Sequence, residues 1–152
     1  NVLDRNLALT LSENGIAWVE QSMAEIFLPQ SLNLDLIDAV SFKKGCYPGQ
    51  EIVARIRYRG KPKQRMIAAQ LPASFEGMIG DAIDLGDDSE SRKATIVCST
   101  FDPIQDRIVI LATVPVSALN LNLGQHTVAD LISLKQIDLP YPVPIETIDD
   151  PA

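Results

Sequence analysis

The feature that most constrains the fold is a series of short β-rich runs between residues 65 and 135. The runs are RMIAAQL, AIDL, KATIVCSTF, RIVILATV and TVADLISL, and segments rich in turn-forming residues separate them. Short strands at this spacing are typical of antiparallel barrels and sandwiches. Helical periodicity is too weak here to supply helices that would cover an open sheet. We therefore expect an α+β chain, mainly β, in which this region forms a closed or nearly closed antiparallel β-barrel.

The region before the barrel is predicted to be a short α/β segment. IAWVEQ and EIFLP have the composition of strands, and Ser31 or Asn33 could cap a short helix over LDLIDAV. A second helix, of about three turns, is predicted over GQEIVARIRYR. Pro48 suits the first turn of this helix, and Gly60 followed by Pro62 ends it.

The break at residues 60–62 divides the chain into three parts. We expect an α/β remnant at 1–61, the barrel at 62–138 and an extended, proline-rich tail at 139–152. The chain begins with NVLDRN and lacks an initiator Met, so we interpret it as a piece of a longer protein.

Composition excludes several classes of protein. Hydrophobic residues make up 46% and charged residues 22% of the 152 residues, which are globular proportions. No apolar run approaches the ~20 residues that span a bilayer, and no signal peptide is recognisable. Two cysteines and one histidine are too few for a disulfide scaffold or a metal site. We expect a cytoplasmic protein with reduced thiols, no bound metal and no membrane partner.

The charge is unevenly distributed. The net charge is −7, yet residues 43–65 hold eight of the thirteen basic residues and only one of the twenty acidic residues. We call the eight cations the basic strip: Lys43, Lys44, Arg55, Arg57, Arg59, Lys61, Lys63 and Arg65. A local patch of this kind attracts anions. The alternative is that these cations pair with acids elsewhere in the chain, as Arg55 is predicted to do with Glu51 four residues away.

Cys46 lies in the basic strip, just before the predicted helix. The N-terminus of a helix and the neighbouring Lys43 and Lys44 both favour a thiolate, so the pKa of Cys46 is predicted to be lower than that of an ordinary cysteine. The alternative is a small buried residue in a tight loop. Cys98, in a strand-like run, is predicted to be an inert core or sheet residue.

The stretch KKGCYPGQEIVAR resembles a family signature, K-G-C-[FY]-x-G-Q-E-x-x-[AS]-R. It is that of the YgfZ-type folate-binding proteins, which are relatives of the glycine-cleavage T-protein, an aminomethyltransferase. Every fixed position of the signature is present between Lys44 and Arg55, and the cysteine favours the YgfZ branch over the transferases. FLPQSLNLD and the later LPY at 139–141 resemble the family more loosely.

The resemblance implies a T-protein-like fold of three domains around a central folate cavity, with a small β-barrel last. It implies binding of tetrahydrofolate, for which much of the pocket would come from an N-terminal half that this chain lacks. It also implies a role in the assembly or repair of iron–sulfur enzymes, and through them a link to tRNA modification. The site positions that follow are Cys46 as the functional thiol and, around the folate, Lys44, Tyr47, Gln50, Glu51 and Arg55.

Two other functions remain open from the sequence. The first is a tetrahydrofolate-dependent one-carbon transferase, in which Glu51 would orient the folate and handle protons. The second is a nucleic-acid-binding module that uses the basic strip. Whether the protein is an enzyme is therefore undecided at this point.

Overall fold

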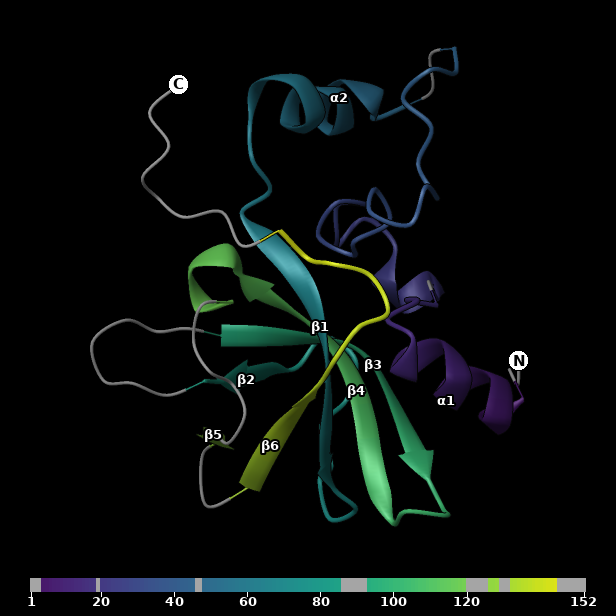
Figure 1. The fold of residues 1–152 in the computed structure, drawn as a ribbon, viewed down its shortest axis with the longest axis vertical. Coiled ribbons are helices and arrows are strands. Elements are labelled where there is room, and N and C mark those ends of the chain that lie inside the picture. Colours follow the sequence, from purple (N-terminus) through teal and green to yellow (C-terminus); the bar gives the residue numbers. More distant parts are fainter. Residues whose placement is uncertain are drawn as a thin grey trace.

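The computed structural model describes residues 4–18, 20–45, 48–85, 93–119, 126–128 and 132–144. Its helices are α1 (Arg5–Glu13), the 3-10 helix η1 (Gln21–Met23), α2 (Gln50–Arg59) and the 3-10 helix η2 (Val116–Ala118). Its strands are β1 (Gln64–Pro72), β2 (Ala82–Asp84), β3 (Lys93–Asp102), β4 (Arg107–Pro115), β5 (His126–Val128) and β6 (Ile132–Ile137). Each β-rich run predicted from the sequence overlaps at least one of these strands, and the mixed, mainly β fold class is confirmed (Figure 1).

The strands form an antiparallel sheet in the order β2-β3-β4-β1-β6-β5. β1 and β4 pair along their full length, from Gln64 opposite Pro115 to Pro72 opposite Arg107. β3 and β4 form a hairpin with a register shift between Ile96 and Cys98. The two long, apolar strands β1 and β4 thus occupy the centre of the sheet.

Side chains alternate between the two faces of the sheet, as strand geometry requires. Ile67 and Ala69 of β1 lie in one apolar cluster, which Ile110 and Ala112 of β4 also join. Met66 and Ala68 of β1 lie in a second cluster on the opposite face. Both faces of the central strands are therefore buried, which explains their almost continuous apolar sequence.

The sheet curls but does not close into the predicted barrel. Ile83 of β2 and Leu134 of β6 belong to the same cluster, although β3, β4 and β1 lie between those two strands in the sheet order. No pairing joins β2 to β5 within the described residues. These end strands have three residues each, too few for a ladder that would close the sheet. Of the predicted closed or nearly closed antiparallel barrel, the antiparallel sheet is confirmed, whereas closure is not found in the described residues.

Residues between 16 and 39 cover the face of the sheet on which Met66 and Ala68 lie. Met23 and Leu32 are buried against Met66 and Leu111 there. The strands predicted in IAWVEQ and EIFLP are not found in the described residues of this segment, and LDLIDAV forms turns in place of a helix. These predictions are wrong because this segment follows a series of turns that pack some of its apolar side chains, among them Ala17, Phe27 and Leu34, on the neighbouring sheet.

Asn33 shows why the predicted helix does not form. Its φ is +58°, outside the helical region. Its side-chain Nδ2 donates to the carbonyl oxygen of Met66 at 2.8 Å, and its Oδ1 accepts from the N–H of Met66 at 3.2 Å. The amide therefore bonds to β1 as a neighbouring strand would, and does not cap a helix.

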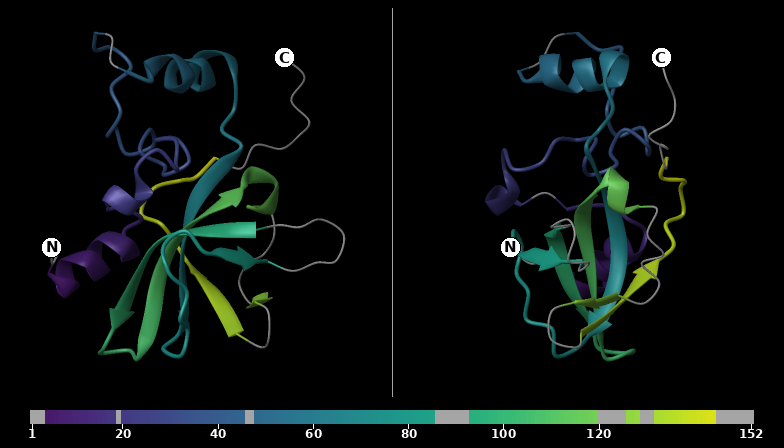
Figure 2. Two further views of the ribbon diagram at one scale, coloured as in Figure 1. Left: turned by 180° about the vertical axis from the view of Figure 1, so that it is seen from behind. Right: turned by 90° about the vertical axis from the view of Figure 1, so that its left-hand side faces the viewer.

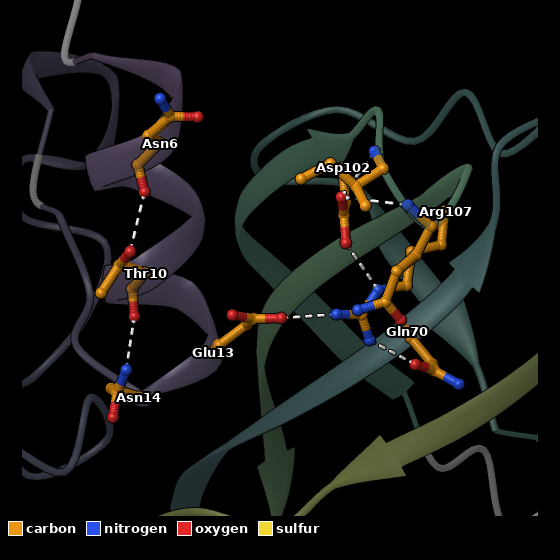
Figure 3. Close-up of polar contacts among 9 residues, drawn as sticks. Asn6, Thr10, Glu13, Asn14, Gln70, Asp102 and Arg107 are labelled. Carbon is orange, nitrogen blue, oxygen red and sulfur yellow. Dashed lines mark hydrogen bonds and ion pairs between the residues drawn. The ribbon is translucent and has the colours of Figure 1, made fainter.

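Arg107 ties α1 to the sheet. Its guanidinium donates to Gln70 of β1, forms an ion pair with Glu13 of α1, and lies 3.0 Å from Oδ2 of Asp102 (Figure 3). The other carboxylate oxygen of Asp102 accepts from the backbone N–H groups of Ile104 and Gln105 in the hairpin turn. One arginine thus connects the helix, a central strand and the turn.

The described part of the tail, residues 139–144, docks on the first turn after α1. The hydroxyl of Tyr141 donates to the carbonyl oxygen of Gly15 at 2.7 Å, and Nδ2 of Asn33 lies 3.5 Å from the same hydroxyl. Gly15 has a φ of +65°, and a Cβ at this position would lie 2.5 Å from Leu139 and 2.6 Å from the Tyr141 hydroxyl. Close packing of the tail therefore requires glycine here.

Candidate functional site

The motif found in the sequence runs through a loop and into α2, which lies at one end of the molecule in all views (Figure 2). α2 begins at Gln50 and ends at Arg59, with Gly60 next, so the predicted second helix is confirmed. Its predicted start is wrong, because the N-cap is Gly49 and Pro48 therefore lies before the helix and not in its first turn. Gly49 precedes α2 with a φ of +80°, and a Cβ there would meet no atom within 4 Å. Glycine is therefore required at residue 49 by the backbone conformation and not by crowding.

Two aromatic rings hold the loop before the motif against α2. The rings of Phe42 and Tyr58 meet edge to face, with centroids 6.4 Å apart. The guanidinium of Arg57 lies over the ring of Phe42 at 5.2 Å, a cation–π contact. Lys43 and Lys44 follow Phe42 directly and are exposed, so their charges lie beside the helix.

One side of α2 faces the rest of the chain and the other faces solvent. Val53 is buried, and its carbonyl oxygen accepts a 2.7 Å hydrogen bond from Nε2 of Gln30. Arg55 and Arg59 are exposed, four residues apart on the outer side, and Tyr58 is 69% exposed. The outer face of α2 therefore presents two guanidinium groups and an aromatic ring.

The members of the basic strip differ in whether they are paired within the described residues. Arg65 is buried and lies 2.7 Å from Asp35 in an ion pair. No ion pair is found there for Arg55, Arg59 or Lys63. The predicted Glu51–Arg55 pair is among those not found, and the alternative that the strip pairs with acids elsewhere holds for Arg65 but not for these three residues.

The predicted site residues are placed as follows. Lys44 lies at the end of the loop, whereas Gln50, Glu51 and Arg55 lie on the first turns of α2. Gln50 is half-buried and the other three are exposed. Cys46 and Tyr47 lie outside the described residues. The described positions of the motif thus lie on an open surface, which can bring cations to an anion but does not enclose a ring system by itself.

The second thiol is in a different environment. Cys98 is free and half-buried in β3, with its Sγ 3.5 Å from Oγ of Ser12. Burial raises the pKa of Cys98, and hydrogen bonds from Ser12 and from the backbone of Leu111 only partly oppose this effect. Cys98 therefore stays a thiol at neutral pH, as its position in a strand predicts.

The supporting roles of three residues were not predicted from the sequence. Gln30, Asn33 and Asp35 all lie in FLPQSLNLD, and each bonds to α2 or β1. The loose family resemblance of this stretch and of LPY was the available signal. In the structure the two stretches meet, since Asn33 contacts Tyr141.

The described residues contain no group of three or more His, Cys, Asp or Glu side chains that could hold a metal ion. Within the same ranges, no helix is both long and apolar enough to cross a membrane.

Comparison with known proteins gives consistent relatives. The tRNA-modifying protein YgfZ of Blochmanniella pennsylvanica is 50% identical over 54 residues, which are 36% of this chain and 16% of the relative. YgfZ of Photobacterium profundum is 34% identical over 117 residues, 76% of this chain and 35% of the relative. YgfZ of Edwardsiella ictaluri is 38% identical over 98 residues, 61% of this chain and 28% of the relative. No protein-family model matches the chain.

The fold and the site together define a small antiparallel-sheet module that carries an exposed cationic loop and helix. The chain is homologous to the C-terminal part of the YgfZ tRNA-modifying proteins, and the resemblance seen in its motif is confirmed to that extent. It spans about a third or less of the length of these relatives.

Proposed function

We propose that this chain is the C-terminal part of a YgfZ-type protein that binds tetrahydrofolate. Through this binding, the protein supports the assembly or repair of iron–sulfur enzymes in the cytoplasm, including enzymes that modify tRNA. The observation that carries the proposal is the set of exposed cations, without ion pairs, on both sides of the KGCYPGQE motif. Homology to proteins named for tRNA modification supports the link to tRNA.

The residues of this chain fit one part of a folate. The glutamate tail carries carboxylates, and Lys44 and Arg55 are exposed cations at the two ends of the motif. Gln50 adds an amide, and Tyr47 and Cys46 complete the predicted set. The ring system needs an enclosed pocket, and in this proposal the N-terminal part of the longer protein supplies it.

Titration of the full-length protein with tetrahydrofolate tests this proposal. Arg55→Gln should weaken binding several-fold, as expected for loss of one charged contact, while leaving the melting temperature nearly unchanged. Arg5→Gln, at an exposed arginine on α1, is the matched control and should change neither quantity. A loss of stability at Arg55 with unchanged folate affinity would show that this arginine is structural.

The transferase alternative depends on Glu51. This carboxylate is exposed on the first turn of α2, where a folate bound at the motif could reach it. If the full-length protein turns over an aminomethyl donor and Glu51→Gln abolishes turnover without loss of folate binding, the protein is an enzyme. If no turnover occurs and Cys46→Ala removes the support of iron–sulfur enzymes, the YgfZ-type function is favoured.

The nucleic-acid alternative has one observation in its favour, the exposed ring of Tyr58 between two exposed arginines on α2. Phosphate contacts make the logarithm of affinity fall linearly with the logarithm of salt concentration. In Arg59→Gln, the slope of this dependence for an RNA strand should decrease by about one. An unchanged slope would remove Arg59 from any RNA contact.

A further inference from the structure

Helix α1 turns polar groups toward the sheet and leaves part of its apolar side uncovered in the described residues. Oγ of Ser12 lies 3.5 Å from Sγ of Cys98 in β3, and Glu13 forms an ion pair with Arg107 of β4. Ser12 is the only buried residue of this nine-residue helix, all of which is described, whereas Leu7 is 49% exposed. A helix this short is marginal in water unless its apolar side is packed. The apolar side of α1 therefore indicates a partner that lies outside the described residues.

A groove of about 250 Å³, the α1 groove, continues this apolar side between α1 and β3. Its apolar lining consists of Ala8, Leu11, Ile16, Trp18 and Ile79. Leu7 lies one turn before Leu11 on the same side of α1, and Trp18 is 51% exposed. Among the described residues that line the groove only Glu20 is charged, so a phosphate or a folate tail finds no cation there. The volume lies below the roughly 300–1,000 Å³ of small-molecule sites, and the groove suits the inserted apolar side chains of a protein surface.

The length of chain outside the structure indicates what covers this groove. This chain spans about a third or less of the length of its YgfZ relatives, over their C-terminal part. Most of the longer protein therefore precedes α1, which is the first helix of the described residues (Figure 1). The same helix forms one wall of the groove. Two surfaces of one chain meet at a high effective concentration, which favours the preceding part over a separate molecule as the occupant.

We propose that the α1 groove is the docking surface for the N-terminal part of the longer protein. The docked part inserts apolar side chains between α1 and β3, over Leu7, Leu11 and Trp18. Burial of these side chains stabilises the contact, because apolar area is removed from water. The proposal rests on the proposed function only in taking this chain as the C-terminal part of a YgfZ-type protein, and it requires no folate.

Cysteine labelling of the full-length protein tests the docking. In separate variants, Leu7→Cys and Trp18→Cys place a thiol at the groove, and the control Ile104→Cys places one in the β3–β4 turn, where Ile104 is 91% exposed. In native alkylation followed by mass mapping, the two groove thiols should react about tenfold or more slowly than the control thiol. All three should react at similar rates in urea, which unfolds the protein. Leu7→Lys should also lower the melting temperature by several degrees, whereas Ile104→Lys should leave it nearly unchanged.

A photo-cross-linking amino acid, benzoylphenylalanine, in place of Leu7 identifies the occupant. Cross-links within one molecule to peptides that precede α1 would support the docking, whereas cross-links between two molecules would show that a second copy covers the groove and would overturn it. Labelling of Trp18→Cys as fast as Ile104→Cys also overturns it, because the groove is then open to solvent. Trp18 lies outside the helices, so this variant keeps the test valid if Leu7→Cys disturbs α1. Protection of the groove without tetrahydrofolate binding would support the docking and count against the proposed function alone.

Discussion

Arg65→Met should separate the structural arginine of the basic strip from the exposed ones. Arg65 is 6% exposed, and its Nη1 donates to Oδ1 of Asp35 at 2.7 Å and to the carbonyl oxygen of Gln30 at 2.9 Å. The side chain of Asp35 is only 7% exposed. Removal of the guanidinium therefore leaves a buried carboxylate and a buried carbonyl without their donor.

The size of this effect follows from what remains buried. Removing one partner of a buried ion pair costs about 3–5 kcal/mol, because the other charge stays desolvated. This is a large fraction of the ~5–15 kcal/mol that stabilises a typical domain. Arg55→Met, at an exposed arginine without an ion pair in the described residues, should change stability by less than about 0.5 kcal/mol. The two variants remove the same charge from the same strip.

Urea unfolding measures both variants, with the slope against urea checked for constancy. The double variant Arg65→Met/Asp35→Leu should recover much of the lost stability, since an apolar pair can replace a buried ion pair at little cost. The reasoning would be refuted if the double variant were as unstable as Arg65→Met alone. It would also fail if Arg55→Met lost as much stability as Arg65→Met.

Three further predictions concern other parts of the molecule. Gly15→Ala should destabilise the fold by about 1–2 kcal/mol through its left-handed φ, and by more through collision with the tail at 139–141, measured by urea unfolding. In native alkylation followed by mass mapping, Cys46 should react before Cys98, because burial raises the pKa of Cys98. For Asp102, burial tends to raise the pKa, but hydrogen bonds from its guanidinium partner and the hairpin turn lower it overall. Its ionised form should therefore stabilise the fold above about pH 4 and lose this effect as the pH falls through the lower folded-state pKa.

Matched controls make these predictions decisive. Gly80→Ala also places alanine at a positive φ, but a Cβ there meets no atom within 4 Å, so it should cost less than Gly15→Ala. Faster labelling of Cys98 than of Cys46 would contradict the prediction that Cys46 is the more reactive thiol. Asp102→Asn should flatten the acid dependence of stability, and an unchanged acid transition would contradict the role assigned to this carboxylate.

The sequence alone determined the strands and helix ends that depend on residues close together in the chain. The five β-rich runs overlap the strands of the sheet because apolar and β-branched residues favour extended structure within each run. α2 ends where Gly60 and Pro62 predict, because a helix terminus depends on a few neighbouring residues. The motif from Lys44 to Arg55 also identified the relatives from residues that are contiguous in the chain. The proposed division of the chain at residues 61–62 and the roles of the motif residues remain predictions.

Only the tertiary structure decided which apolar side chains are buried and which charges are paired. IAWVEQ and EIFLP read as strands because they are apolar, but Ala17 and Phe27 within them pack on a sheet formed much later in the chain. Asn33 reads as a helix cap, yet its amide bonds to Met66, thirty-three residues away. Arg65 and Arg55 are equivalent in a count of charge, and burial beside Asp35 alone makes one of them structural. Whether the sheet closes likewise depends on the lengths of its end strands. The sequence pattern within each run does not predict those lengths. These outcomes depend on contacts between distant residues, whose partners exist only after the chain has folded.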